Sequence, residues 1–356
     1  MREDAYGAAG VDIDAANEAV ERYRSLLEEQ RDQRVLRGIG GFSGCFSFEG
    51  YREPVLVAST DGIGTKVIVA AQLGRYDGVG ADLVNHCIND VLCANAQPLF
   101  FLDYLAMGKL DADAAAAIVA SIAAACRRYD VALLGGETAE MPGVYTPPQF
   151  DLAGTLVGAV ERSDLIDLTA VIPGDVILGL PANGLHTNGY SLARRVIARD
   201  SWHEPVALDA SETIADALLE VHPCYLETVR DLQRSGIAIK SVAHITGGGV
   251  MDNVPRALPE HLAARFDAST WHVPPIVALV ARRARLTDDE AYRTLNMGVG
   301  FCCIVSAADG PRAIAIANAS LATHPVPHAA GAAALIGEVE PAHPCGPRVI
   351  VANAFR

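Results

Sequence analysis

Apolar residues recur along the chain at two different spacings, and each spacing predicts a different kind of element. Residues 16–27 carry apolar side chains three and four positions apart behind Asp12 and Asp14, which predicts a capped helix with one buried face. The same spacing predicts helices over residues 81–94 and about 111–129. These helices alternate with shorter apolar runs, so the chain combines helices with strands.

The shorter apolar runs predict strands of ordinary length at 45–48, 54–59, 98–107 and 153–161. A further strand begins at Val131 and is expected to end in a Gly-Gly-Glu-Thr turn at 135–138. A Pro-Gly-Asp turn at 173–175 suggests a boundary, so we predict domains over 1–170 and 171–356. Mixed alternation of strands and helices predicts an α/β (α+β) fold for both.

Composition supports two globular domains and narrows the choice of partners. The chain has 356 residues, of which 51% are apolar and 20% charged, enough to bury a large core. A formal net charge of −15 disfavours nucleic acid and anionic membranes as partners. A small anion is still a possible ligand, but it needs backbone N–H groups, a few basic side chains or a bridging metal.

Cysteines and apolar segments predict a cytoplasmic setting. The eight cysteines include no C-x-x-C pair, which favours buried free thiols over disulfides or zinc ligands. The first ten residues, MREDAYGAAG, lack the apolar core of a signal peptide. The most apolar helical stretch, 114–126, is too short to span a bilayer.

Three acidic residues stand beside glycines at the expected ends of strands. They are Asp61 in TDGIGTK, Asp90 in IND and Glu137 in GGET. Carboxylate oxygens suit Mg²⁺, which often bridges to nucleotide phosphates. Each residue alone could also be a turn residue or helix cap, but the three together favour a metal–phosphate site.

Two glycine-rich segments are candidates for binding phosphate, GIGGFSG at 38–44 and HITGGG at 244–249. Glycines let consecutive backbone N–H groups approach an anion closely. Neither segment matches a Walker A or Rossmann motif, and a glycine triplet is also common in plain turns. Thr65 and Lys66, close to Asp61, add a hydroxyl and a positive charge that suit phosphate.

The segment GLHTNGYS at 184–191 places His186 and Asn188 in a loop before a helix that is expected to start near Gly189. A helix N-terminus attracts anions, and a histidine there could carry a proton or donate a hydrogen bond. In the alternative interpretation, Asn188 only caps the helix while His186 packs beneath it.

Taken in order, these segments resemble the aminoimidazole ribonucleotide synthetase family, also called phosphoribosylformylglycinamidine cyclo-ligase. The resemblance rests on GVDIDAAN, GIGGF, STDGIGTK, IND, FFLDYLAMGKL, GGETAEMPG, HTNGYSLAR, HITGGG followed by NVPR, and NMGVG. It extends from about Gly10 to the last strand. Single blocks are weak signals, whereas their joint order and spacing are specific.

The resemblance implies a PurM-like fold of two α/β domains, with the N-terminal strands of two copies forming a shared barrel in a homodimer. It implies the cofactors ATP and Mg²⁺ and the substrate formylglycinamidine ribonucleotide. The implied products are aminoimidazole ribonucleotide, ADP and phosphate, in a step of purine biosynthesis. The apolar strands at 45–48 and 54–59 also favour a dimer, because alone they would leave an apolar edge exposed.

The resemblance also implies roles for individual residues. Asp61, Asp90 and Glu137 correspond to metal–phosphate ligands, and Asp61, Lys66 and His186 are the catalytic candidates. The phosphate cradle is expected to include Gly40, Gly41, Lys66, Gly247 and Gly248. Further nucleotide contacts are expected from Thr60, Thr65, Asn89, Thr138, Asn188 and Thr246.

Length and motifs argue against the other enzymes known on the same scaffold. Formylglycinamidine ribonucleotide synthase, selenophosphate synthetase and thiamine monophosphate kinase are the enzyme alternatives. Selenophosphate synthetase usually carries a reactive cysteine or selenocysteine near its N-terminus, and here no cysteine precedes Cys45. A catalytically silent nucleotide-binding protein is the alternative from another class, but it would not need all three acidic residues.

Overall fold

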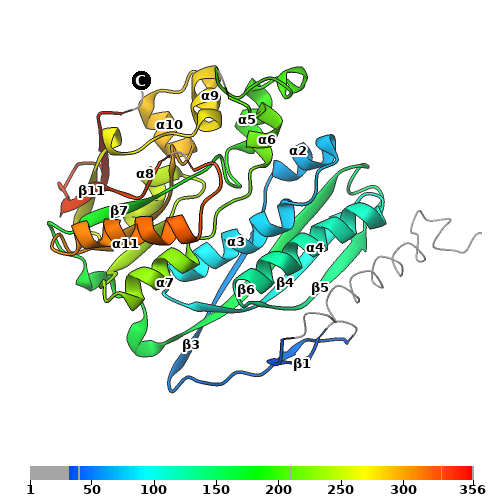
Figure 1. Ribbon diagram of the computed structural model, residues 1–356, viewed down its shortest axis with the longest axis horizontal. Helices are drawn as coiled ribbons and strands as arrows, with labels where there is room; N and C mark the ends of the chain where they lie inside the picture. Colours follow the sequence, from blue (N-terminus) through cyan, green and yellow to red (C-terminus); the bar gives the residue numbers. More distant parts are fainter. Residues whose placement is uncertain (1–31, 39–40, 209, 330, 355–356) are drawn as a thin grey trace, which may run out of the picture. The chain divides into compact units, whose positions relative to one another are not determined.

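The structure is a computed structural model that describes residues 32–38, 41–208, 210–329 and 331–354 (Figure 1). The chain divides into two compact units, Met1–Asp164 and Leu165–Arg356. The predicted domain boundary follows residue 170, six residues beyond this division. The predicted helix over 16–27 and the candidate Gly40 lie outside the described residues.

The first unit combines strands with three α-helices in the part that the structure describes. Its elements are β1 (Val35–Arg37), β2 (Cys45–Phe46), β3 (Pro54–Gly62), α2 (Lys66–Leu73), α3 (Val79–Leu92), β4 (Gln97–Met107), α4 (Ala112–Arg128), β5 (Ala132–Glu140), β6 (Phe150–Glu161) and the 3₁₀ turn η2 (Arg162–Asp164). β1 and β2 form a separate antiparallel pair. Asp111 caps α4 by accepting hydrogen bonds from the backbone N–H groups of Asp113 and Ala114.

The main sheet of this unit has the strand order β3-β6-β4-β5. β4 and β5 run parallel, while the other neighbours are antiparallel. α3 and α4 pack against each other and against the sheet (Figure 1). Between them and the strands lie Leu83, Phe101 and Ile118, all fully buried. The sheet therefore has a face covered by helices, on which the side chains of alternate strand residues are buried.

The predicted helices and most predicted strands of this unit are present, with two differences at strand ends. β5 continues through the expected turn to Glu140, because Gly135–Glu140 stay paired with β4. β3 continues to Gly62 because its pairing with β6 is unbroken. Asp61 and Glu137 are therefore strand residues, and Asp90 lies on a helix rather than at a strand end.

The second unit has a larger sheet and shorter helices. Its elements are η3 (Leu168–Ala170), β7 (Val176–Pro181), α5 (Tyr190–Val196), η4 (Arg199–Ser201), α6 (Ile214–Leu219), α7 (Leu226–Arg234), β8 (Ser241–His244), α8 (Gly249–Asn253), η5 (Val254–Ala257), β9 (Leu262–Asp267), η6 (Ala268–Thr270), α9 (Pro275–Ala284), α10 (Asp288–Thr294), β10 (Val299–Val305), α11 (Gly310–Thr323), β11 (Ala334–Pro341) and β12 (Val349–Ala352). The strand order is β12-β9-β11-β7-β10-β8. Only β12 and β9 are parallel among these described neighbours. Both units are thus mixed α/β, as predicted.

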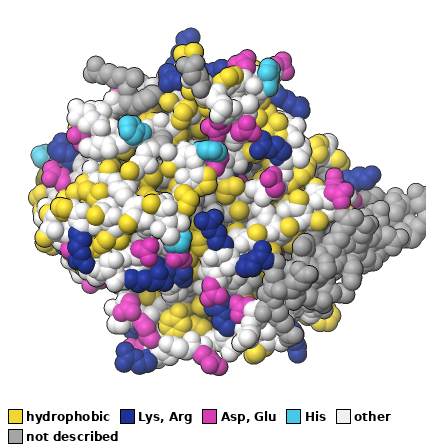
Figure 2. Space-filling view, in the orientation of Figure 1, with side chains coloured by type: hydrophobic (Ala, Val, Ile, Leu, Met, Phe, Trp, Pro, Cys, Tyr) yellow, Lys and Arg dark blue, Asp and Glu magenta, His cyan; other side chains and the backbone are white. Residues whose placement is uncertain are grey.

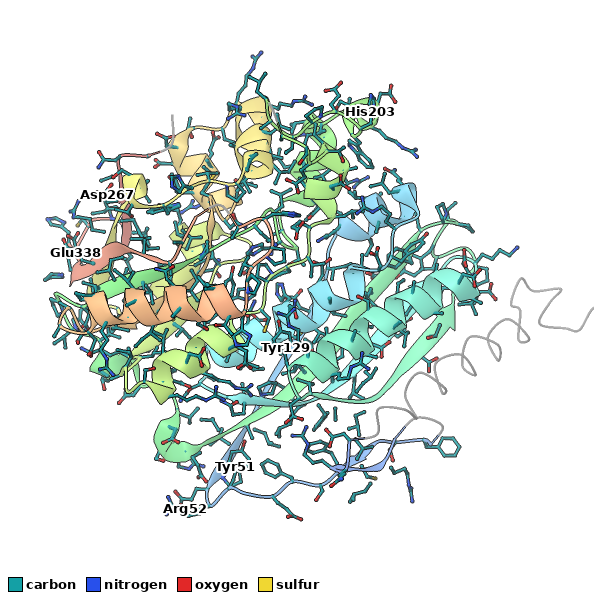
Figure 3. The ribbon with its side chains drawn as sticks, viewed as in Figure 1. Tyr51, Arg52, Tyr129, His203, Asp267 and Glu338 are labelled. Carbon is teal, nitrogen blue, oxygen red and sulfur yellow. The ribbon has the colours of Figure 1, made fainter. Side chains whose placement is uncertain are left out.

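Local contacts secure the start of β3. Tyr51 and Arg52 precede this strand (Figure 3). The Tyr51 hydroxyl donates to the carbonyl of Ala159 at 3.5 Å, and the Arg52 backbone N–H donates to Oε1 of Glu161 at 2.6 Å. Both partners belong to β6, so the entering chain is tied to the strand with which β3 pairs.

The surface and the thiols complete the description. On the face drawn in Figure 2, Lys and Arg side chains are interspersed with Asp and Glu. All eight cysteines are free, and Cys87, Cys126, Cys302 and Cys303 are buried. Among the described residues, no helix combines the length and apolarity needed to cross a bilayer.

Candidate active site

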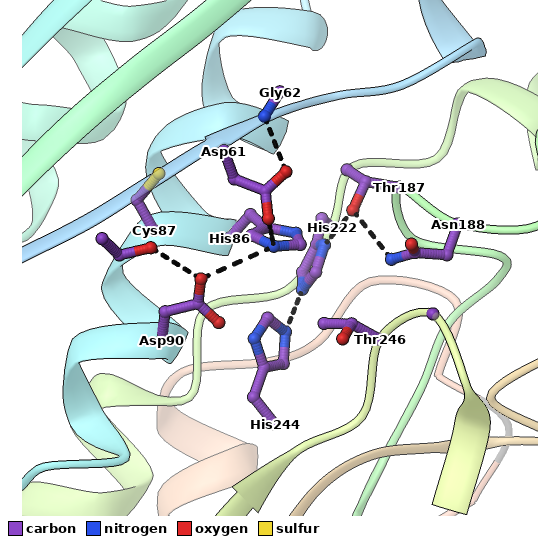
Figure 4. Close-up of polar contacts among 12 residues, drawn as sticks. Asp61, Gly62, His86, Cys87, Asp90, Thr187, Asn188, His222, His244 and Thr246 are labelled. Atoms are coloured by element: carbon purple, nitrogen blue, oxygen red, sulfur yellow. Dashed lines mark hydrogen bonds and ion pairs between the residues drawn. The ribbon is translucent and has the colours of Figure 1, made fainter. Parts of the chain in front are cut away.

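The first candidate group surrounds Asp61 on β3. Nε2 of His86 lies 2.8 Å from Oδ2 of Asp61, and the backbone N–H of Gly62 donates to Oδ1 at 2.7 Å (Figure 4). The Asp61 side chain is 45% exposed while that of His86 is 4% exposed. A partly open carboxylate is therefore held from behind by a buried imidazole.

Asp90 joins this group from α3. It lies four residues after His86, so one helix turn brings both side chains to the same face. Oδ2 of Asp90 is 3.8 Å from Nε2 of His86 and accepts a hydrogen bond from the Ser59 hydroxyl at 2.7 Å. Ser59 and Asp61 are two positions apart on β3, so they project from the same sheet face.

The charges of this group support one another. Burial is the largest single influence on Asp61 and raises its pKa, but the hydrogen bond and charge of His86 together with the backbone N–H of Gly62 lower the pKa overall. Burial by itself lowers the pKa of His86, yet the hydrogen bond to Asp61 and the charge of Asp90 raise it above its ordinary value. The arrangement favours an imidazolium facing two carboxylates.

The ligand atoms of these three residues lie close enough to hold a divalent cation together, but His86 must lose its proton before it can serve as a ligand. One ligand atom each from Asp61, His86 and Asp90 lies within 4.8 Å of the others. The two carboxylates suit Mg²⁺, while an imidazole is more common around transition metals. His86 was not predicted, although its position four residues before Asp90 on an expected helix was a usable signal.

Glu137 lies apart from this group within one copy of the chain. Its cross-strand partner is Tyr104, which pairs in turn with Ala153, and Ala153 pairs with Gly62. Three strand spacings of about 4.8 Å place Glu137 about 14 Å from β3. Alternation along β3 also sets this row on the sheet face opposite Asp61. The structure brings Asp61 and Asp90 together, but not Glu137.

The structure does not support the predicted contact of Lys66 with phosphate. Lys66 and Asp82 are both 0% exposed, and the Lys66 ammonium lies 2.8 Å from the Asp82 carboxylate. Lys66 begins α2 and its stem runs inward to α3. Its charge is neutralised by the buried ion pair with Asp82, which joins the two helices. A buried ammonium requires such a counter-ion.

The remaining nucleotide candidates of this unit occupy varied places. Thr65 precedes α2 at its N-cap, and Gly41 is exposed. Thr60 is exposed on the sheet face away from α3, where its hydroxyl lies 2.8 Å from that of Thr155. Thr138 is half-buried on β5. Asn89 is 0% exposed within α3, so its burial does not support the predicted contact with a nucleotide.

In the second unit, the segment around His186 forms a loop between β7 and α5. Gly189, not Asn188, is the N-cap of α5, and the cap makes no side-chain hydrogen bond. His186 has a backbone φ of 62° and is 2% exposed. A Cβ on Gly300 would lie 2.8 Å from Cε1 of His186, so the glycine leaves room for the ring. Asn188 therefore does not cap this helix, but the buried His186 agrees with the other half of that alternative, in which His186 packs beneath the helix.

The glycine segment after β8 forms a second loop, which Asn253 holds. The Asn253 amide donates to the carbonyl oxygens of Gly247 at 3.1 Å and Gly249 at 2.9 Å. A Cβ on Gly249 would come within 2.0 Å of the Tyr292 carbonyl oxygen, so only glycine fits there. Thr246 also reaches Asn253, with its hydroxyl 3.5 Å from Oδ1. The loop is thus fixed from its own unit.

The two loops of this unit come close together. A Cβ on Gly247 would lie 3.3 Å from Oδ1 of Asn188. His222 and His244, which were not predicted, lie behind them, with their Nε2 atoms 3.1 Å apart (Figure 4). His244 was visible as the first residue of HITGGG, but no sequence pattern pointed to His222.

Comparison with known proteins assigns the family. The N-terminal domain family of AIR synthase related proteins matches residues 45–160, and the corresponding C-terminal domain family matches residues 173–344. The chain belongs to the AIR synthase family. The predicted family is thereby confirmed.

Individual relatives agree with this assignment. A phosphoribosylformylglycinamidine cyclo-ligase from Xanthomonas oryzae pv. oryzae (strain PXO99A) is 46% identical over 340 residues, covering 95% of this chain and 97% of the relative. One from Carboxydothermus hydrogenoformans is 47% identical over 318 residues, covering 88% and 92%. Both alignments extend through the two units.

Solved structures share the fold at low sequence identity. Thiamine-monophosphate kinase from Stenotrophomonas maltophilia K279a has a TM-score of 0.65 at 19% identity and covers 94% of this chain and 95% of its own. The E. coli hydrogenase maturation protein HypE has a TM-score of 0.64 at 19% identity, covering 94% and 92%. These similarities establish the PurM-like scaffold.

Proposed function

We propose that this protein closes the imidazole ring of aminoimidazole ribonucleotide, using ATP and formylglycinamidine ribonucleotide and releasing ADP and phosphate. The curated relatives that cover nearly the whole chain carry the name of this ligase of purine biosynthesis. The observation that supports the chemistry is the pairing of Asp61 with Asp90 beside His86. Such a group suits a nucleotide bound through a divalent cation.

The reaction explains the need for ATP. An amide carbonyl is a poor electrophile, and its oxygen is a poor leaving group. Transfer of the γ-phosphoryl group to that oxygen releases ADP. It makes the carbonyl carbon a better electrophile and makes the oxygen part of a good leaving group. An amidine nitrogen of the same molecule then forms the new C–N bond, the C–O bond breaks, and phosphate departs as the nitrogen loses a proton. Holding both ends in one site gives the advantage of an intramolecular reaction.

The residues divide this work by their chemistry. Asp61 and Asp90 would hold Mg²⁺, which supplies charge neutralisation at the nucleotide phosphates when bound. The loop containing Thr246, Gly247 and Gly248 offers backbone N–H groups to an anion. His186, which shares the loop before α5 with Asn188, is our candidate for contact with the reacting amide or the transferred phosphoryl group.

We also propose a homodimer through the face of the first sheet that no helix among the described residues covers. Leu56 of β3 is 63% exposed, and Tyr104 of β4, on the same face, is 39% exposed. Phe46 of β2 packs on Phe100 at 5.3 Å between ring centroids and covers only part of this face. A second copy related by a two-fold axis would place the same apolar side chains of both copies against each other and so bury them.

Isotope transfer tests the reaction directly. Substrate carrying ¹⁸O at the formyl group should yield ¹⁸O-labelled inorganic phosphate and unlabelled ADP, because the oxygen must leave attached to phosphorus. Mass spectrometry of the released phosphate measures this. Unlabelled phosphate formed together with the ring product would contradict O-phosphorylation. Failure of the substrate to react at all, in protein that binds ATP, would contradict the proposed ligase function.

A further inference from the structure

His222 occupies a central position in the second unit without belonging to any helix or strand. It lies in the segment between α6 and α7 and is 0% exposed. The segment is held in place on both sides of the histidine. The Asn183 amide donates to the Val221 carbonyl at 2.9 Å, and the Tyr225 hydroxyl donates to the Pro181 carbonyl at 2.9 Å. These hydrogen bonds therefore fix the backbone that carries the imidazole.

The ring connects the two loops of the candidate site. Nδ1 of His222 lies 3.3 Å from the Thr187 hydroxyl, and Nε2 lies 3.1 Å from Nε2 of His244 (Figure 4). Thr187 belongs to the loop before α5, while His244 ends β8 and leads into the glycine loop. The chain of contacts continues to Asn188, whose amide donates to the Thr187 hydroxyl at 3.4 Å.

From these contacts we infer that His222 is a positioning residue for the ring-closing reaction, one that sets the loop of Thr187 relative to the glycine loop beginning after His244. The inference deepens the proposed function and rests on it. His222 acts through its neighbours in this role. The two loops are the parts of the second unit that would meet an anionic ligand.

The direction of the hydrogen bond between His222 and His244 depends on which of the two rings carries the proton at Nε2. In the neutral pair, a single proton lies between the two Nε2 atoms, because a neutral imidazole has one N–H and one lone pair. If His222 donates this proton, its Nδ1 must accept the hydroxyl proton of Thr187. If His244 donates, Nδ1 of His222 carries the proton and donates to Thr187. The tautomer of His244 is therefore linked to the hydroxyl orientation of Thr187.

Packing alone would not require these nitrogens. The His222 ring lies 4.4 Å from that of His186 and 5.1 Å from that of His244, measured between centroids. A phenylalanine could fill such a stack without the cost of burying polar atoms. It could not hold a threonine at one end and a histidine at the other. The bridging role and the packing role thus predict different variant behaviour.

Three substitutions separate the two contacts. His222→Asn retains an amide near Nδ1, His222→Gln retains one near Nε2, and His222→Phe retains ring volume alone. We expect kcat to fall by about 10- to 100-fold in His222→Phe, with a far smaller change in the KM for ATP. At least one amide variant should recover part of this loss. His203→Phe, at an exposed histidine of the same unit (Figure 3), is the matched control and should retain wild-type kcat.

A second measurement does not depend on turnover. Thr187→Val removes the hydroxyl, and ¹⁵N NMR of the histidine side chains in the intact protein should then show a changed tautomer balance at His244, one ring beyond the mutated contact. Thr323→Val, at an exposed threonine of α11, should leave the His244 signals unchanged. This measurement stays informative if His222→Phe fails to fold.

The outcomes are distinct. Wild-type kcat in a folded His222→Phe protein, or His244 signals indifferent to Thr187→Val, would overturn the positioning role. Loss of kcat with no recovery in either folded amide variant would also overturn it, because packing would then explain the effect. If the wild-type protein makes no ring product while the NMR coupling is present, the proposed function fails and the connection between the loops stands.

Discussion

The two units hold their candidate groups by different means. In the first, Asp61 and Asp90 lie on a regular strand and a regular helix, so backbone geometry alone brings them together. In the second, the candidate residues lie on loops whose placement depends on buried side chains such as Asn253 and His222. The first arrangement tolerates changes outside the group, whereas the second depends on its supporting contacts.

The units differ in their surfaces as well. Among the described residues, six large apolar side chains are exposed in the first unit, namely Leu36, Phe42, Phe48, Leu56, Tyr104 and Val144, against Ile172 and Leu208 in the second. The larger number in the first unit includes Leu56 and Tyr104, which lie on the sheet face proposed for the dimer. The first unit therefore carries both the charged group and the surface that we propose for association, while the loops of the second are held by its own buried side chains.

The largest effect is expected from the buried ion pair that supports the first unit. Asp82→Ala removes the carboxylate facing Lys66 and should lower the free energy of unfolding by about 3–5 kcal/mol, because a buried ammonium loses its counter-ion. Urea denaturation measures this. The double variant Lys66→Met, Asp82→Leu should regain most of the loss. An Asp82→Ala variant as stable as the wild type would show that the Lys66–Asp82 pair does not stabilise the first unit.

Loss of charge at the site itself should affect rate more than stability. Asp61→Asn preserves size, and we expect kcat to fall by about 10²- to 10³-fold with little change in thermal unfolding. Asp151→Asn, at another exposed carboxylate of the same sheet, is the control and should retain activity. Wild-type turnover in folded Asp61→Asn protein would show that the metal has been placed wrongly.

The surface difference predicts different responses to a buried charge. Leu56→Lys should convert the proposed dimer to monomer at micromolar concentration, because it places an ammonium in an apolar interface. Light scattering measures the mass. Ile172→Lys in the second unit, where Ile172 is 54% exposed, should leave the dimer intact. A wild-type protein that is monomeric would remove the contrast between the surfaces.

The smallest effect concerns Asp103, which shares a cross-strand row with Asp61. Burial raises the pKa of Asp103 to about 7. Because the folded pKa exceeds the unfolded one, its contribution to stability is full below about pH 4 and is lost as the pH rises toward 7. The slope for one group is at most about 1.4 kcal/mol per pH unit.

Asp103→Asn should reduce this slope, as measured by urea unfolding between pH 5 and pH 8. Asp113→Asn, on the exposed first turn of α4, provides the comparison and should leave the slope unchanged. An unchanged slope in Asp103→Asn would show that the Asp103 carboxyl does not titrate over this range.

What the sequence determined by itself was the kind of protein. Ordered motifs indicated the family, and periodicity indicated most elements, because side-chain spacing reports local backbone geometry. Helix α4 and strand β4 agree closely with their predicted bounds. The same local signals showed that Asp61 and Asp90 are candidates for one acidic group.

Tertiary structure decided which candidates meet. Glycines at 135 and 136 suggested a turn, but pairing with β4 keeps them in a strand and carries Glu137 to the far side of the sheet. Lys66 is the first residue of α2, and its side chain turns inward to Asp82. His222 contacts the two candidate loops of the second unit from a segment that has no motif of its own. These outcomes depend on strand order and on burial between elements distant in the chain, which spacing along the sequence does not encode.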